Sequence, residues 1–233
     1  YILAGISKNS KQSNEASLKY VIFGSFASGL MLFGLSWLYG ISGSTDIYIV
    51  HEKLLDSGNE LMIFMSLLFI LVGFGYKISM VPFHYWTPDV YEGASTPVTA
   101  FFSVAPKAAG LSILIRFFYT VFTNDSGFSS DSVLSGVDWT LIIATLSALT
   151  MTIGNLLALY QQNVKRMLAY SSIGHAGYIL IGISLAPFSG LGLQASLFHI
   201  LNHAVMKGAA FIAVAGIVTT LAVTHMDKIK GLG

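Results

Sequence analysis

The stretch GFGYKISMVPFHYWTPDVYEG, residues 73–93, combines a membrane-spanning composition with a helix-breaking proline. It continues an apolar run, residues 61–72, to the length of about 20 residues that one transmembrane helix needs. Pro82 lacks an N–H group and its ring clashes with the carbonyl group of Ile78, so the helix must kink or break just after Lys77. In a membrane, neighbouring helices, hydroxyl groups or water must bind the freed backbone groups. The pattern predicts a hydrated cavity beside Lys77, with a simple packing kink as the alternative.

The composition of the whole chain agrees with a membrane location. Of the 233 residues, 54% are hydrophobic and 10% are charged, and the mean hydropathy is +0.71. Soluble domains carry about 25% charged residues, so this is an integral membrane protein. The net charge of +1 argues against nucleic acid as a partner, because phosphate binding needs clustered Lys and Arg residues. With no cysteine, this sequence cannot form disulfide bonds, thiolate metal sites or cysteine-ligated iron–sulfur clusters.

Five apolar segments joined by short loops are long enough to cross a bilayer, and a sixth, residues 167–185, is close to the minimum length. We therefore predict an all-α fold, a polytopic transmembrane helical bundle with a proline-broken helix, built as a single membrane domain over residues 1–233. Tyr1 to Gly5 read as the end of a helix without an initiator Met or a signal peptide, so we expect a fragment of a longer protein. The expected spans are residues 15–39, 60–81, 97–122, 139–160, 167–185 and 194–223.

The charges of the loops predict the orientation of the bundle. Cytoplasmic loops of membrane proteins collect Lys and Arg residues. The loops on one side of the expected bundle contain Lys8, Lys11, Lys165, Arg166, Lys228 and Lys230. The opposite loops contain a single lysine, Lys53, together with Asp46, Glu52, Asp56, Asp125, Asp131 and Asp138. The first side is therefore expected to be cytoplasmic.

Several cations lie inside the expected spans. Lys19 and Arg116 are near span ends, where a long side chain can reach the lipid headgroups. Lys107 and Lys207 lie about ten residues or more from either end, which corresponds to about 15 Å of helix. A charge at the bilayer centre costs about 2.5–3.5 kcal/mol on insertion scales, and such residues normally face a bundle interior or a wet cavity. We predict that Lys77, Lys107 and Lys207 relay protons, with a purely architectural charge as the alternative.

Two histidines extend this proton path. His199, His203 and Lys207 recur every four residues, which places them on one stripe of a helix. Imidazole rings titrate near neutral pH and can receive and release protons, so the stripe predicts a proton ladder. A zinc site is not expected, because the stripe offers no third ligand. His84, in the helix break, either passes protons to Lys77 or satisfies the broken backbone.

Two longer stretches carry a family resemblance: GYKISMVPFHYWTPDVYEGASTPVTAFFSVAPKAA, residues 75–109, and NVKRMLAYSSIGHAGYIL, residues 163–180. They resemble the antiporter-like membrane subunits of respiratory complex I, in particular the subunit N type and its archaeal counterpart in F420H2 dehydrogenases. The resemblance implies two inverted helical repeats, each with one broken helix, of which this chain holds a part. Lys77 matches the lysine beside the first broken helix, Lys107 the central lysine and His84 the histidine of the motif. Lys207 and its two histidines resemble a stripe in sister subunits and in sodium/proton antiporters.

The resemblance also implies parts that lie outside this sequence. A glutamate that pairs with the lysine at the position of Lys77 would precede Tyr1, and the second broken helix would follow Lys230.

The function implied by the resemblance is proton translocation within a complex I-like NADH- or F420H2-quinone oxidoreductase. Partner subunits would hold the NADH or F420H2 site, flavin, iron–sulfur clusters and quinone, while this chain would bind no cofactor or metal and have no redox site of its own. Its expected partners are the other membrane subunits and the lipid bilayer of a prokaryotic cell membrane. The alternatives are a subunit of a Mrp-type sodium/proton antiporter or of a membrane-bound hydrogenase, or an assembly scaffold that conducts nothing.

Overall fold

The structure, a computed structural model, describes residues 1–123, 138–221 and 223–229. This part of the chain is helical throughout its regular elements. The helices are η1 (Ile2–Gly5), α1 (Lys11–Ser42), α2 (Ile47–Asp56), α3 (Glu60–Ile78), α4 (Trp86–Gly93), α5 (Thr96–Phe122), α6 (Trp139–Leu159), α7 (Val164–Ser184), α8 (Gly190–Leu221) and η3 (Met226–Lys228).

The predicted all-α transmembrane bundle is confirmed. In the described residues, six helices are long and apolar enough to cross a membrane: α1, α3, α5, α6, α7 and α8. Each contains most of one predicted span, and α1, α5, α7 and α8 begin one to four residues earlier than predicted. The two short helices α2 and α4 were not predicted, because they lie in stretches that the analysis assigned to loops.

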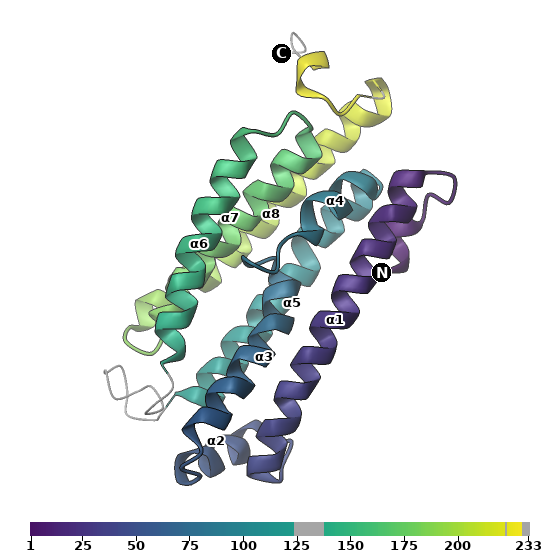
Figure 1. Cartoon of the computed structure of the whole chain (residues 1–233). Coiled ribbons are helices and arrows are strands. Elements are labelled where there is room, and N and C mark those ends of the chain that lie inside the picture. Colours follow the sequence, from purple (N-terminus) through teal and green to yellow (C-terminus); the bar gives the residue numbers. More distant parts are fainter. Residues whose placement is uncertain (124–137, 222, 230–233) are drawn as a thin grey trace.

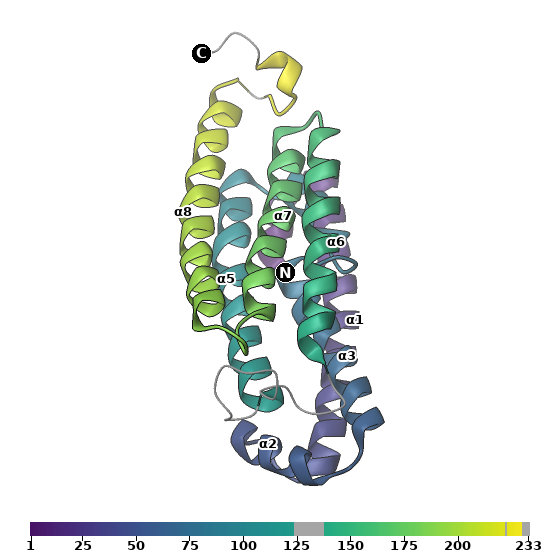
Figure 2. The same ribbon diagram turned by 90° about the vertical axis from the view of Figure 1, so that its left-hand side faces the viewer.

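The helices form a bundle in which α5 connects two groups (Figures 1 and 2). On one side α1 packs against α3, and α3 packs against α5. On the other side α6 packs against α7, and both α7 and α5 contact α8. The short helix α4 lies between α1 and α7, at the end of the bundle where α1 begins and where α6 turns into α7 (Figure 1). Helix α2 lies at the opposite end.

Two segments far apart in the sequence meet at the end predicted to be cytoplasmic. Asn163 pairs with His225 in an isolated β-bridge, and the Val164 N–H donates to the Thr224 carbonyl. The turn between α6 and α7 and the segment after α8 therefore lie on the same side, as the predicted alternation requires. Of the residues used to predict orientation, Asp125, Asp131 and Lys230 lie outside the described residues.

The backbone changes conformation between the end of α3 and Pro82. Helix α3 ends at Ile78, the residue whose carbonyl the Pro82 ring would meet in a continuous helix. Ser79 takes a left-handed conformation with φ of 63°, which turns the chain out of the helix. The Val81–Pro82 peptide bond is cis.

Side chains from two other helices bind the groups around this break. The buried Val81 N–H donates to the Thr150 hydroxyl of α6 at 3.1 Å. The Thr87 hydroxyl donates to Ser79 Oγ at 2.7 Å, and the Trp86 indole N–H donates to the Tyr76 carbonyl at 3.0 Å. Two backbone groups at the break, the Val81 N–H and the Tyr76 carbonyl, are thus bound by hydroxyl and indole side chains, which is one way in which a membrane tolerates such a break.

Helix α4 begins four residues after Pro82 and includes Pro88 in its first turn. A proline is tolerated there because the first N–H groups of a helix have no intrahelical acceptor. Its buried residues include Trp86, Thr87, Val90 and Tyr91, whereas Asp89 and Glu92 are only partly buried. The helix therefore presents an apolar face to the bundle and two acids to its rim.

Small residues let α6 and α7 approach to backbone contact. A Cβ atom on Gly154 would lie 2.5 Å from the Gly174 nitrogen, and one on Gly177 would lie 2.7 Å from the Met151 nitrogen. The Ser147 hydroxyl of α6 donates to the Gly177 carbonyl at 2.7 Å. Close packing of small residues and hydrogen bonds between helices are the interactions that hold helices together in lipid.

Candidate functional site

Lys107 lies in the middle of α5 with 1% of its surface exposed. Its ammonium Nζ donates a hydrogen bond of 2.9 Å to the Ser172 hydroxyl oxygen of α7. The same oxygen lies 3.0 Å from Nε2 of His203, on α8, which is also buried. Three helices thus bring an amine, a hydroxyl and an imidazole into one hydrogen-bonded chain.

Lys207, on α8, is also buried and also bound by a serine of α7. It is 4% exposed, and its Nζ donates to the Ser171 hydroxyl at 2.6 Å. Ser171 and Ser172 are neighbours on α7, so this helix offers one hydroxyl group to each buried lysine. Among the described residues, neither lysine forms an ion pair with a carboxylate, as the sequence predicted from the positions of the acids.

A third histidine, which the sequence analysis missed, joins the site from α7. His175 Nδ1 lies 3.1 Å from His199 Nε2, and the two rings stack with centroids 5.3 Å apart. The His175 and His203 ring centroids are 5.8 Å apart. The spacing of Ser171, Ser172 and His175 at i, i+1 and i+4 could have indicated a polar stripe on this helix. On α8 the stripe ends in a buried lysine, whereas α7 has no lysine at the corresponding depth to mark its stripe.

The chain from Lys107 to His203 can pass a proton. A charged lysine only donates, so the Ser172 oxygen must accept its hydrogen bond. The Ser172 O–H can then donate to His203 Nε2 when His203 carries its ring hydrogen on Nδ1. Transfer along these two bonds leaves Lys107 neutral, His203 charged and Ser172 unchanged.

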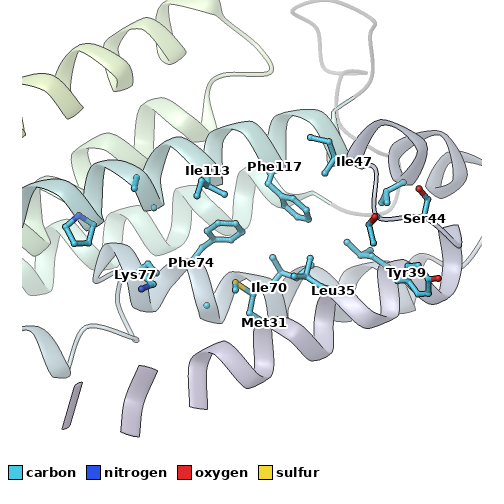
Figure 3. A pocket seen from close by; sticks show the side chains of 17 residues that line it. Met31, Leu35, Tyr39, Ser44, Ile47, Ile70, Phe74, Lys77, Ile113 and Phe117 are labelled. Carbon is cyan, nitrogen blue, oxygen red and sulfur yellow. The ribbon is translucent and has the colours of Figure 1, made fainter. Parts of the chain in front are cut away.

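Lys77 is not part of this hydrogen-bonded chain. Within the described residues it forms no ion pair or hydrogen bond, and its Nζ lies 5.9 Å from the ring centroid of Tyr1. It lies at one end of a cleft of about 590 Å³ between α1, α2, α3 and α5, which runs toward Tyr39 and Ser44 (Figure 3). The residues between the two ends are apolar, among them Phe74, Ile113 and Phe117. A cavity lies beside Lys77, but its walls are mostly hydrophobic, and the hydration predicted for it stays a prediction.

His84 is also separate from the buried network. Its side chain is 3% exposed and its ring stacks on Tyr85, with centroids 4.5 Å apart. Its Nδ1 atom has no hydrogen-bond partner in the described residues. The proton-passing role predicted for His84 stays a prediction, as do the roles of Lys77, Lys107, Lys207, His199 and His203.

A cluster of charges holds α4 at the rim of the bundle. Arg166 Nη1 contacts Asp89 at 2.6 Å and Glu92 at 2.9 Å, and Lys19 Nζ contacts Asp89 at 2.6 Å and Glu15 at 2.7 Å. Burial opposes ionisation of Asp89, but the hydrogen bonds from Lys19 and Arg166 outweigh it and lower the pKa of this carboxyl group below its usual value. Lys19 therefore joins an ion cluster, where the sequence predicted a side chain that reaches the headgroups.

Lys165 is buried as well, and it lies in the first turn of α7, whereas the sequence placed it in a loop. It is 5% exposed, and its Nζ donates to the carbonyl groups of Glu92 at 2.7 Å and Ala94 at 2.6 Å. These carbonyls end α4, where a cation is favourable because the last carbonyl groups of a helix lack intrahelical partners. Lys165 thus fixes the end of α4 to the start of α7.

Buried amines that are bound by hydroxyl groups on transmembrane helices, beside histidines and a broken helix, are features of membrane proteins that move ions or protons. Comparison with known proteins gives the family. The model of the family described as "NADH:quinone oxidoreductase/Mrp antiporter, TM" matches residues 1–233. The chain belongs to this family.

Relatives and solved structures agree with this assignment. The chain is 46% identical to NADH-quinone oxidoreductase subunit N 2 of Chloroherpeton thalassium and 44% identical to subunit N of Chlorobium chlorochromatii, in each case over 100% of this chain and 45% of the relative. The chain thus spans about half the length of the curated relatives it matches.

The structural likenesses come from three kinds of membrane complex. A chain of the archaeal membrane-bound sulfane sulfur reductase superposes with a TM-score of 0.87 at 32% identity, over 100% of this chain and 45% of that one. A chain of the Mrp complex from Dietzia gives 0.75 at 26% identity, over 89% and 36%. A chain of respiratory complex I from Thermus thermophilus gives 0.68 at 34% identity, over 88% and 40%.

Proposed function

We propose that this chain is the proton-translocating part of a membrane subunit in a complex I-like NADH- or F420H2-quinone oxidoreductase. The observation that supports the proposal most strongly is the hydrogen-bonded chain from Lys107 through Ser172 to His203. The likeness to subunit N of NADH-quinone oxidoreductase points to the same class. The partners would be the other membrane subunits of the complex, in a prokaryotic cell membrane.

Lys107 and Lys207 would be the groups that gain and lose protons. Their hydrogen bonds to adjacent serines on α7 keep both amines away from lipid, and no carboxylate neutralises them in the described residues. The protonation of a lysine without a carboxylate partner is sensitive to charges elsewhere in the membrane part of the complex, because no neighbouring acid stabilises its charged form. The imidazoles of His203, His175 and His199 would continue the path away from α4, toward the start of α8.

The redox chemistry would take place in other subunits. We expect NADH or F420H2, flavin, iron–sulfur clusters and quinone to bind there, which agrees with the absence of cysteine ligands from this sequence. This chain would then contribute to the enzyme as a subunit that moves protons.

The experiment measures proton pumping by the assembled complex in proteoliposomes, with substitutions in the full-length subunit. Lys107→Ala and Lys77→Ala are expected to reduce pumping strongly, and Ser172→Ala by about tenfold or more, while the complex still assembles. Lys77→Arg is expected to fail as well, because a guanidinium group does not release its proton. The control is Ser112→Ala, an exposed hydroxyl of α5 that bonds only to Ala108 of its own helix. Wild-type pumping in both lysine-to-alanine variants would instead favour the scaffold.

A Mrp-type sodium/proton antiporter subunit is the second candidate, because the Mrp complex shares the fold with a TM-score of 0.75. A subunit of a membrane-bound hydrogenase is a further candidate of the same kind. Proteoliposomes separate these functions: sodium/proton exchange without an electron donor would support the antiporter, whereas pumping that starts only with NADH or F420H2 and a quinone supports the oxidoreductase.

A further inference from the structure

We propose that Tyr91, on α4, is a further relay residue that admits protons to Lys107 from the α4 side of the bundle. The inference rests on the proposed function and extends it. The proposed path begins at Lys107, and Tyr91 would be the group through which a proton reaches that lysine. Tyr91 is completely buried, and in the described residues its hydroxyl group has no hydrogen-bond partner within 3.5 Å. The side chain of Ser172 still acts on this hydroxyl as a longer-range hydrogen-bond partner, against the burial that raises the pKa of Tyr91, and Lys107 Nζ lies 5.8 Å from the centroid of the Tyr91 ring.

The packing of Tyr91 requires its ring but not its hydroxyl group. The ring meets Phe211 and Trp86 edge-on, with centroids 5.8 Å and 6.3 Å away. Phenylalanine would make the same contacts without burying an unpaired polar atom, which is unfavourable. A buried hydroxyl without a partner therefore calls for an explanation other than packing. The explanation that we propose is that the Tyr91 hydroxyl gains a hydrogen-bond partner only during proton transfer.

Helix α4 joins this hydroxyl to the charged rim. Two residues before Tyr91, Asp89 belongs to the ion cluster with Lys19 and Arg166, and the next residue, Glu92, contacts the same arginine. A pocket of about 170 Å³ opens among these side chains. The Thr99 hydroxyl lies 3.0 Å from the Tyr91 carbonyl, and Lys165 binds the Glu92 carbonyl, so the backbone on both sides of the ring is fixed. Asp89 and Glu92 thus lie on the partly exposed face of α4 and Tyr91 on its buried face, near Lys107.

The hydrogen bonds of Ser172 provide a gate. In the structure Ser172 accepts from Lys107 and contacts His203, and Tyr91 has no partner within 3.5 Å among the described residues, which is the arrangement expected while Lys107 is charged. Once Lys107 has lost its proton, the Ser172 oxygen can accept from Tyr91 and the Ser172 O–H can donate to the neutral amine. A proton carried by water then binds the tyrosine oxygen as the tyrosine proton moves to Ser172 and the serine proton moves to Lys107. One proton reaches Lys107, and both hydroxyl groups are restored.

The test compares Tyr91→Phe with Tyr76→Phe in the full-length subunit of the assembled complex. Tyr76 is a buried tyrosine of the same aromatic cluster, and its hydroxyl has a structural acceptor, the Tyr20 carbonyl, at 2.8 Å. We expect Tyr91→Phe to lower the protons pumped per electron pair by about tenfold with no loss of thermal stability. Tyr76→Phe is expected to lower thermal stability and leave pumping per assembled complex unchanged.

Two further measurements separate the outcomes. Fluorotyrosine at position 91 keeps a hydroxyl group and is expected to restore pumping, which a purely structural role of the ring would not require. Lys107→Ala is measured in parallel. If Lys107→Ala abolishes pumping while Tyr91→Phe pumps as wild type, the role of Tyr91 is refuted and the proposed function stands. If both pump as wild type, the proposed function itself fails.

Discussion

Replacing Gly154 with alanine tests how closely α6 and α7 approach. The new Cβ atom would lie 2.5 Å from the nitrogen and 2.9 Å from the Cα of Gly174, and 3.1 Å from the Tyr170 carbonyl oxygen. All three are backbone atoms, which cannot rotate away, so the helices must separate locally by about 1 Å to reach normal contact distances. That shift would also stretch the hydrogen bond from Ser147 to the Gly177 carbonyl.

The expected cost follows from these contacts. Overpacking costs about 1–3 kcal/mol, and weakening one interhelical hydrogen bond costs about 1 kcal/mol more. Alanine is favoured over glycine inside a helix by about 0.5–1 kcal/mol, which offsets part of the loss. Gly154→Ala should therefore lower the free energy of unfolding by about 2 kcal/mol. The assay is reversible unfolding of the full-length subunit in mixtures of mild detergent and dodecyl sulfate.

Two other glycines provide matched controls. The three atoms nearest to a Cβ on Gly174 all belong to the exposed Asn155 side chain, the closest being Oδ1 at 2.8 Å, and this side chain can shift at the expense of its hydrogen bond to the Tyr178 hydroxyl. A Cβ on Gly216 would meet no atom within 4 Å. We expect Gly174→Ala to lose less than about 1 kcal/mol and Gly216→Ala to gain up to about 1 kcal/mol. If Gly154→Ala is as stable as Gly216→Ala, α6 and α7 do not meet at this backbone contact.

Two more predictions address the helix break and the charged rim. Thr150→Val removes the acceptor of the buried Val81 N–H and should cost about 1–3 kcal/mol in the same unfolding assay, whereas Thr145→Val, at an exposed hydroxyl that bonds only to its own helix, should change little; equal stabilities would show that the break does not depend on α6. Asp89→Asn should cost about 0.5–1 kcal/mol at pH 7, because the ion cluster is partly exposed. Since the pKa of Asp89 is lowered in the folded protein, its contribution is fully present above the unfolded pKa of about 3.9 and is lost as the pH falls through the lower folded value. Thermal unfolding of both proteins from pH 7 to pH 3 checks this, and a difference that grows toward pH 3 would contradict it.

The sequence by itself determined the transmembrane helices, the position of the break and the depth of the two central lysines. These features follow from local rules: apolar length sets the spans, and the proline ring acts on the carbonyl of a residue only four positions away, so α3 ends at Ile78. The depth of Lys107 and Lys207 follows from counting residues along a helix of fixed rise. The short helix α4 escaped this reasoning because the stretch after the break is too short and too polar to be a membrane span and was assigned to a loop.

Only the tertiary structure decided which groups these lysines meet. Ser172 is hydrogen-bonded to Lys107 and His203 from two other helices, and Lys165 binds carbonyl groups of α4. Such partners depend on the rotation and the relative depth of helices that are distant in sequence, and helical periodicity fixes neither. The same is true of the Tyr91 hydroxyl. Whether a buried hydroxyl finds a hydrogen-bond partner depends on the side chains of all the helices around it, and only the tertiary structure places those.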